Sequence, residues 1–85
     1  MKKSNPRLKR VFLEVVENQL KANDPPETRE TLKRLTSEGI SEDNARIYIA
    51  QAVCVEVYHA MKHKQEFNLP RYLKNLKCLP EEPEE

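Results

Sequence analysis

The sequence predicts an all-α fold, a compact domain of four helices, on three observations. Apolar residues recur at helical spacing, capping and breaking residues fall between the periodic stretches, and no stretch alternates as a strand would. With 85 residues, including one glycine and six prolines, the chain suits a single small domain. We expect helices at approximately residues 6–22, 26–38, 42–64 and 69–78, packed around the apolar third helix.

The first expected helix, residues 6–22, has one apolar face. Asn5 can cap it, and Pro6 suits its first position because a proline lacks the N–H that would have no partner there. Gln19 projects into the middle of the apolar face. The face itself contains Leu8, Val11, Phe12, Val15, Val16 and Leu20.

The second expected helix, residues 26–38, is mostly polar. Asp24 and Glu27 have the spacing of a capping box, although Pro26 can force Pro25 to stay outside the helix. Gly39 is suited to a left-handed cap at its end. The residues expected to face inward are Thr28, Leu32 and Leu35.

The third expected helix, residues 42–64, follows the capping residue Ser41 and is apolar on nearly every side, so we expect it to be buried. Glu56 falls among its apolar positions. The fourth, residues 69–78, follows Phe67 as a hydrophobic staple and Asn68 as a cap. Its apolar side contains Leu69, Tyr72, Leu73 and Leu76.

The expected domain spans residues 5–79, between a basic, flexible stretch at 1–4 and a disordered acidic tail at 80–85. The net charge of +1 gives no overall field toward nucleic acid or an anionic membrane. We expect no secretory leader and no membrane span. We therefore expect Cys54 and Cys78 to be reduced thiols, which indicates a cytoplasmic protein, and we expect Cys54 to be a structural thiol.

Gln19 and Glu56 are the two polar residues that fall on apolar faces. One interpretation, which we favour, is that each is satisfied structurally by a backbone N–H or a tyrosine. The other is a functional polar pocket between the first and third helices, built from these two side chains. The sequence leaves both open.

A metal site is the next possibility, because Glu56, His59 and His63 lie on one face of the third helix. This ligand set is incomplete, so we expect neither metal nor cofactor. One glycine cannot form a phosphate-binding loop or a dinucleotide fingerprint, and no base is placed to activate Cys54. The hydroxyl side chains are each explained by a cap or a solvent face, so we expect no enzyme activity and no catalytic residue.

The motifs of the chain resemble those of a family of small uncharacterised prokaryotic all-helical domains, a domain of unknown function. The resemblance covers nearly all of residues 5–79 and implies a compact helical domain without an established activity. The family's histidines correspond to Lys9, Leu13, Asp43 and Ile47 here, so the resemblance does not imply a metal. The shared motifs are Asn5-Pro6, Val16-Glu17-Asn18-Gln19, Asp24-Pro25-Pro26-Glu27, Thr31-Leu32, Arg34-Leu35, Glu38-Gly39, Phe67 and Arg71-Tyr72.

These observations favour a non-enzymatic interaction or structural module. The third helix has more apolar surface than its neighbours can cover, so we expect a homodimer whose interface includes Ile47, Cys54 and Tyr58. A small-ligand or metal-binding protein that uses the Gln19/Glu56 pocket is the alternative. A weak nucleic-acid binder acting through the basic N-terminus is the second alternative, which Glu42 and Asp43 disfavour. The sequence names neither the biological partner nor the geometry of the oligomer.

Overall fold

The computed structural model describes the backbone of residues 6–81 and the side chains of residues 9–81, and it confirms the all-α four-helix domain. The helices are α1 (Pro6–Ala22), α2 (Pro26–Ser37), α3 (Glu42–His63) and α4 (Leu69–Cys78), and residues 6–81 contain no strand. The second and third helices end one residue earlier than predicted. The expected N-terminal stretch, Asn5 as a cap, and the tail beyond Glu81 lie outside the described residues.

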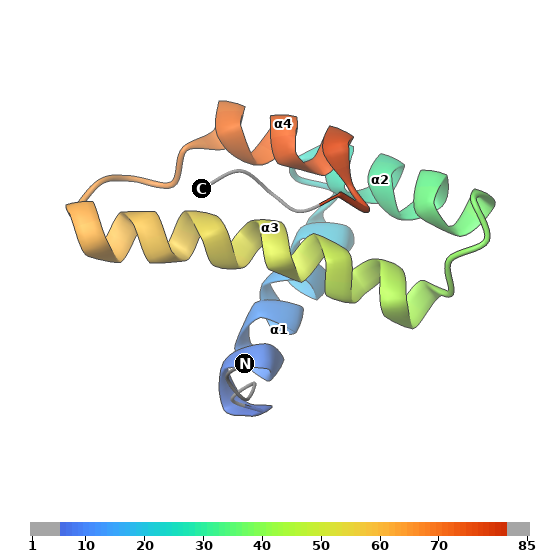
Figure 1. Ribbon diagram of the computed structural model, residues 1–85, viewed down its shortest axis with the longest axis horizontal. Helices are drawn as coiled ribbons and strands as arrows, with labels where there is room; N and C mark the ends of the chain where they lie inside the picture. Colours follow the sequence, from blue (N-terminus) through green and yellow to red (C-terminus); the bar gives the residue numbers. More distant parts are fainter. Residues whose placement is uncertain (1–5, 82–85) are drawn as a thin grey trace.

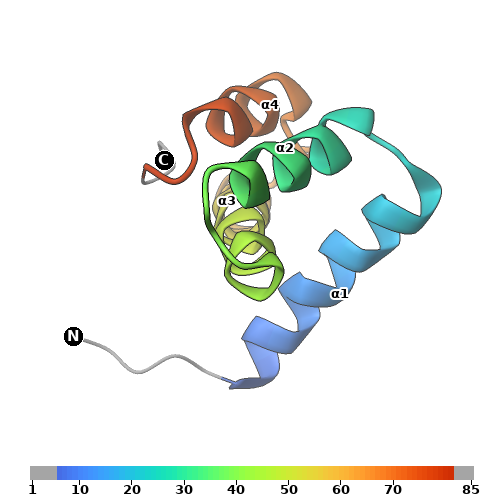
Figure 2. The same cartoon turned by 90° about the vertical axis from the view of Figure 1, so that its right-hand side faces the viewer.

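The long helix α3 is the centre of the fold and packs against each of the other three helices. Helix α4 runs beside it in the opposite direction, and α1 crosses it steeply (Figure 1). Seen along α3, α1 lies on one side and α2 and α4 lie on another (Figure 2). The remaining side of α3 has none of the described helices against it.

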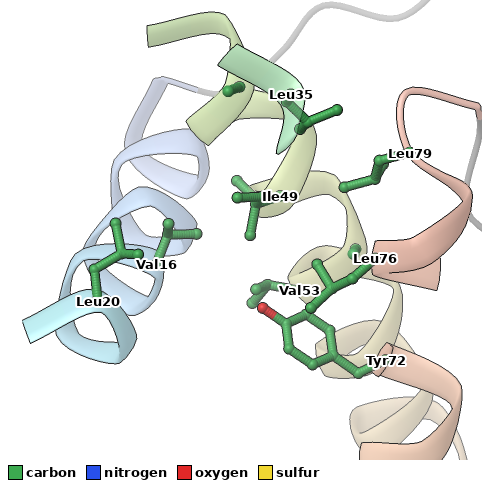
Figure 3. Close-up of a cluster of buried hydrophobic side chains, with 11 residues drawn as sticks. Val16, Leu20, Leu35, Ile49, Val53, Tyr72, Leu76 and Leu79 are labelled. Carbon is green, nitrogen blue, oxygen red and sulfur yellow. The ribbon is translucent and has the colours of Figure 1, made fainter. Parts of the chain in front are cut away.

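The hydrophobic core lies where the inner faces of the four helices meet (Figure 3). Fully burying one aliphatic side chain of this kind stabilises the folded state by about 1.5–3 kcal/mol. A core this small therefore depends on a few residues. Its members are Val16, Leu20, Leu35, Ala45, Ile49, Ala50, Ala52, Val53, Tyr72, Leu76 and Leu79.

Residues in the left-handed backbone conformation follow three of the helices. Gly39 has φ +96° after α2, as predicted, and its N–H donates to Thr36 while the next N–H, of Ile40, donates to Leu35. This pair of bonds satisfies carbonyls that the helix leaves without partners. Asn23 (φ 53°) and Lys64 (φ 53°) take the same place after α1 and α3.

The predicted caps of α3 and α4 are confirmed. The side chain of Ser41 accepts a hydrogen bond from the Asn44 N–H, and that of Asn68 accepts one from the Arg71 N–H. The predicted staple is also present, because the ring of Phe67 packs edge-on against Tyr72 with 5.2 Å between centroids.

The capping box that the spacing of Asp24 and Glu27 suggested for α2 does not form, and Pro25 stays outside the helix, which is the alternative that the sequence left open. Pro26 forces the residue before it into an extended conformation, so Pro25, with ψ 152°, becomes the N-cap and offers no side-chain acceptor. Asp24 is then one residue too far from the helix to cap it.

Two predictions about burial are also wrong. Val11 is 50% exposed, because the N-terminal half of α1 extends away from the other helices (Figure 1). The third helix is not buried all round, since Met61 is exposed together with Cys54 and Tyr58, two residues of the flank that we expected its neighbours to leave uncovered. Helices α1, α2 and α4 cover only part of its circumference.

Candidate interaction surface and buried polar clusters

The uncovered side of α3 carries a line of residues that we call the outer stripe: Ile47, Gln51, Cys54, Tyr58 and Met61. Their spacing of four, three, four and three residues places them along one face of a helix. Tyr58 is 52% exposed and Met61 is 75% exposed, while Ile47 is half-buried. Four of the five side chains are apolar or weakly polar, which is unusual for a solvent-facing stripe.

Charged residues lie at the two ends of this stripe, and they differ in sign. Glu42 and Asp43 are exposed in the first turn of α3. Lys62 lies in the last turn, with its Nζ 5.5 Å from the centroid of the Tyr58 ring, and Lys64 follows the helix. Each charge complements the helix dipole at its own end. The face is therefore acidic at its start, apolar in its middle and basic at its end.

Gln19 belongs to a buried cluster that links three helices. Its Oε1 accepts hydrogen bonds from the hydroxyls of Thr28 and Tyr72, each 2.7 Å long, and the two hydroxyl oxygens are 3.3 Å apart. The hydroxyl of Tyr72 points from α4 toward α1 (Figure 3). A shared acceptor of this kind fixes the positions of both donors, and each bond contributes about 1 kcal/mol.

The environment of Tyr72 changes its acidity. Burial raises the pKa of its phenol above the usual value near 10, and the hydrogen bonds with Thr28 and Gln19 oppose that rise. The neutral phenol is the form that donates to Gln19, so the cluster is intact at neutral pH.

Glu56 is 1% exposed and has a separate set of partners. Arg71 donates to both carboxylate oxygens, from Nε to Oε2 at 2.6 Å and from Nη2 to Oε1 at 3.0 Å. The backbone N–H of Asn68 donates to Oε1 at 3.1 Å. The hydrogen bond to Glu56 raises the pKa of the Arg71 guanidinium. Three donors thus satisfy a carboxylate that would be costly to bury alone.

This arrangement completes the N-terminal cap of α4 from another helix. In a capping box, the N-cap side chain bonds the third N–H of the helix, and the residue at that third position returns a bond to the N-cap N–H. Asn68 makes the first bond, but the third residue is Arg71, which has no acceptor. Glu56 of α3 supplies the missing acceptor and pairs with Arg71 as well. Its negative charge also lies at the favourable end of the α4 dipole.

Gln19 and Glu56 therefore contact different groups, a tyrosine and a threonine in one case and an arginine and a backbone N–H in the other. These contacts favour the structural interpretation of both residues. A small hollow of about 190 Å³ lies between α2 and α4, and neither Gln19 nor Glu56 lines it. A shared pocket for these two side chains stays a prediction without structural support.

The histidines of the suggested metal set stack on each other. The rings of His59 and His63 have centroids 5.4 Å apart, and the Nε2 of His59 is buried without a hydrogen-bond partner among the described residues. The carboxylate of Glu56 is already held by Arg71. Within residues 9–81, no group of three potential ligands could hold a metal ion. The metal alternative gains nothing from this geometry.

Of the basic residues near the N-terminus, the structure describes the side chains of Lys9 and Arg10, and both are exposed. Glu42 and Asp43 are also exposed, at the start of the helix that would have to enter a groove of the nucleic acid. Nucleic-acid binding stays a prediction. In residues 6–81, none of the helices has the length and hydropathy that a membrane crossing requires.

The roles of several residues in the polar clusters were not predicted from the sequence. Thr28 was expected inward but without a polar partner, and Tyr72 was assigned only to an apolar face. The role of Glu56 at the cap of α4 could have been anticipated, because an arginine at the third position cannot accept a hydrogen bond from the N–H of Asn68. Arg34 was also missed, and its guanidinium donates to the carbonyls of Leu76 and Leu79 at the end of α4.

No family model matches this chain, and no curated protein or solved structure matches it either. The resemblance to small prokaryotic helical domains stays a prediction.

Proposed function

We propose that this chain is a non-enzymatic interaction module of the cytoplasm, and that it associates with its own copy through the outer stripe of α3. The observation that carries the proposal is the exposure of Cys54, Tyr58 and Met61 in the middle and second half of the longest helix. Contiguous apolar surface of this kind marks interaction sites on proteins of this size.

The polar clusters support a structural rather than a chemical role for the interior. Gln19 fixes Thr28 and Tyr72, and Glu56 fixes the start of α4. The two polar side chains that the sequence singled out thus hold helices together. The exposed thiols of Cys54 and Cys78 support a reducing compartment, because exposed thiols are prone to oxidation outside one.

Sedimentation equilibrium from about 5 to 500 µM protein tests self-association, over a range that covers weak dimers. We expect a reversible monomer–dimer equilibrium. Tyr58→Asp places a charge in the stripe and is expected to shift the equilibrium to monomer without changing the helical circular dichroism. Val11→Asp is the matched control, because Val11 is as exposed as Tyr58 but lies on α1. A wild-type chain that stays monomeric throughout would contradict the proposal.

A further inference from the structure

The outer stripe has the pattern of a coiled-coil seam. Ile47, Cys54 and Met61 recur every seven residues, and Gln51 and Tyr58 recur at the complementary positions between them. This alternation of four and three residues is the a/d repeat by which one helix packs along another. Extended backward by three residues, it includes exposed Asn44, so the repeat runs for about 26 Å of α3.

The charges at the ends of α3 decide the direction in which a second helix can lie. A parallel copy would bring the two acidic helix starts to one end of the pair and the two basic helix ends to the other. An antiparallel copy instead places the acidic start of each α3 against the basic end of the other. Like charges in close register are unfavourable and opposite charges favourable, so the antiparallel orientation is preferred.

We infer that two copies of this chain pair through an antiparallel α3–α3 seam on a two-fold axis between Ala52 and Val53. This inference rests on the proposed self-association and adds its geometry. In an antiparallel coiled coil, each a residue faces a d residue of the other helix. That rule is satisfied along the whole stripe when Ile47 of one copy faces Tyr58 of the other and Gln51 faces Cys54.

The same register also brings complementary residues together at both ends of the seam. Asn44 of each copy faces Met61 of the other, so that six layers form along the two-fold seam. Asp43, in the first turn of α3 in one copy, and Lys64, directly after the last turn of α3 in the other, then lie at the same end of the seam. Moving the register by one heptad loses two of the layers and both of these charge pairs. Gln51 near the centre contributes a polar position of the kind that fixes register.

Disulfide cross-linking tests this geometry with cysteines at the end layer. In the full-length chain with Cys54→Ser and Cys78→Ser, we add Asn44→Cys and Met61→Cys together and separately. Both sites are exposed, and they lie too far apart along one helix to bond within a chain. Under mild oxidation we expect the double variant to form mostly covalent dimer, while each single variant remains mostly monomeric on a non-reducing gel. Circular dichroism checks that all three variants fold.

Each outcome has a definite meaning. Efficient cross-linking of either single variant would show a parallel pairing, and absence of cross-linking in a double variant that still dimerises would show a different interface. Either result would overturn the antiparallel seam and leave self-association standing. A double variant that sediments as a monomer and does not cross-link, together with a monomeric wild-type chain, would refute both proposals.

Discussion

The carboxylate of Glu56 shows how one residue can organise a chain of this size. It lies in the middle of α3, where a carboxylate without partners would destabilise the fold, and it accepts three hydrogen bonds from Arg71 and Asn68. Two of those donors belong to a flexible side chain and one to the backbone at the start of α4. Glu56 therefore fixes the start of α4 against the buried side of α3.

We expect Glu56→Ala to lower the free energy of unfolding by about 2–3 kcal/mol, since it removes charge-assisted hydrogen bonds from a buried site. The side chain of Arg71 is 25% exposed and can regain water, which limits the loss. Glu17→Ala is the matched control, because Glu17 also pairs with an arginine but is 47% exposed. It should cost less than about 1 kcal/mol. Urea unfolding measures both, and equal losses would show that Glu56 has no special role.

The raised pKa of Tyr72 predicts a loss of stability at alkaline pH. The unfolded phenol ionises near pH 10, whereas the folded one keeps its proton to higher pH. Its stabilising contribution is complete below pH 10 and is lost as the pH rises through the folded pKa, because the unfolded state then releases the proton first.

Tyr72→Phe tests that linkage. The variant lacks the hydrogen bond to Gln19 and the longer contact with the hydroxyl of Thr28, so we expect it to be less stable by about 1 kcal/mol at pH 9. Between pH 9 and pH 11 it should then lose less stability than the wild-type chain. Urea unfolding at the two pH values measures the difference. The same loss in both chains would exclude a contribution from this phenol.

At the scale of the elements, the C-terminal ends of three helices depend on left-handed backbone conformations rather than on side-chain caps. The residues after α1, α2 and α3 all have positive φ, but only one of them is glycine. A residue with a side chain is strained in that conformation, while glycine is not. The end of α3 at Lys64 is therefore less favourable than the end of α2 at Gly39.

Substitutions at these two ends should have opposite effects. Gly39→Ala is expected to cost about 1–2 kcal/mol from backbone strain alone, because no atom lies within 4 Å of the added methyl group. Lys64→Gly should gain about 0.5–1 kcal/mol for the converse reason. Thermal unfolding at low protein concentration, where dimers do not form, measures both. A destabilised Lys64→Gly variant would show that the lysine side chain outweighs the strain.

The elements were predictable from the sequence because their signals are local. Ser41, Asn68 and Gly39 mark helix ends through their own side chains or their lack of one. The start of α2 at Pro26 was also predictable, but its cap was not, since the capping spacing of Asp24 competed with the constraint that Pro26 places on Pro25. Where two local rules disagreed, the backbone constraint prevailed over the side-chain cap.

The candidate site was predictable only in part, for a related reason. The flank with Ile47, Cys54 and Tyr58 was expected to be thinly covered, and Cys54 and Tyr58 are exposed, while Ile47 is half-buried. The partners of Gln19 and Glu56 lie 9 to 53 residues away along the chain, and helical periodicity does not reveal contacts at such separations. Finding that Tyr72 reaches Gln19 requires knowing how α1, α2 and α4 are arranged around α3.

At the scale of the whole molecule, four helices bury a core that leaves one side of α3 exposed. A domain of this length buries a smaller share of its surface than a larger one and is correspondingly marginal in stability. Pairing through the outer stripe would add buried apolar surface at the helix that contacts all the others. Association and folding are then coupled, because anything that binds only the folded chain stabilises it.

This coupling predicts that the melting temperature rises with protein concentration. When the folded chain is mostly dimeric, each tenfold increase in concentration adds about 0.7 kcal/mol per chain, and the unfolding entropy of a domain of this size converts that into about 4 °C. Scanning calorimetry from about 50 to 500 µM, where a micromolar dimer is formed, measures the rise. Met61→Asp should melt at one temperature throughout, because Met61 is 75% exposed within one chain and its replacement would disrupt the proposed seam. A constant melting temperature for the wild-type chain would mean that α3 keeps its outer stripe in water and that the fold reaches its stability alone.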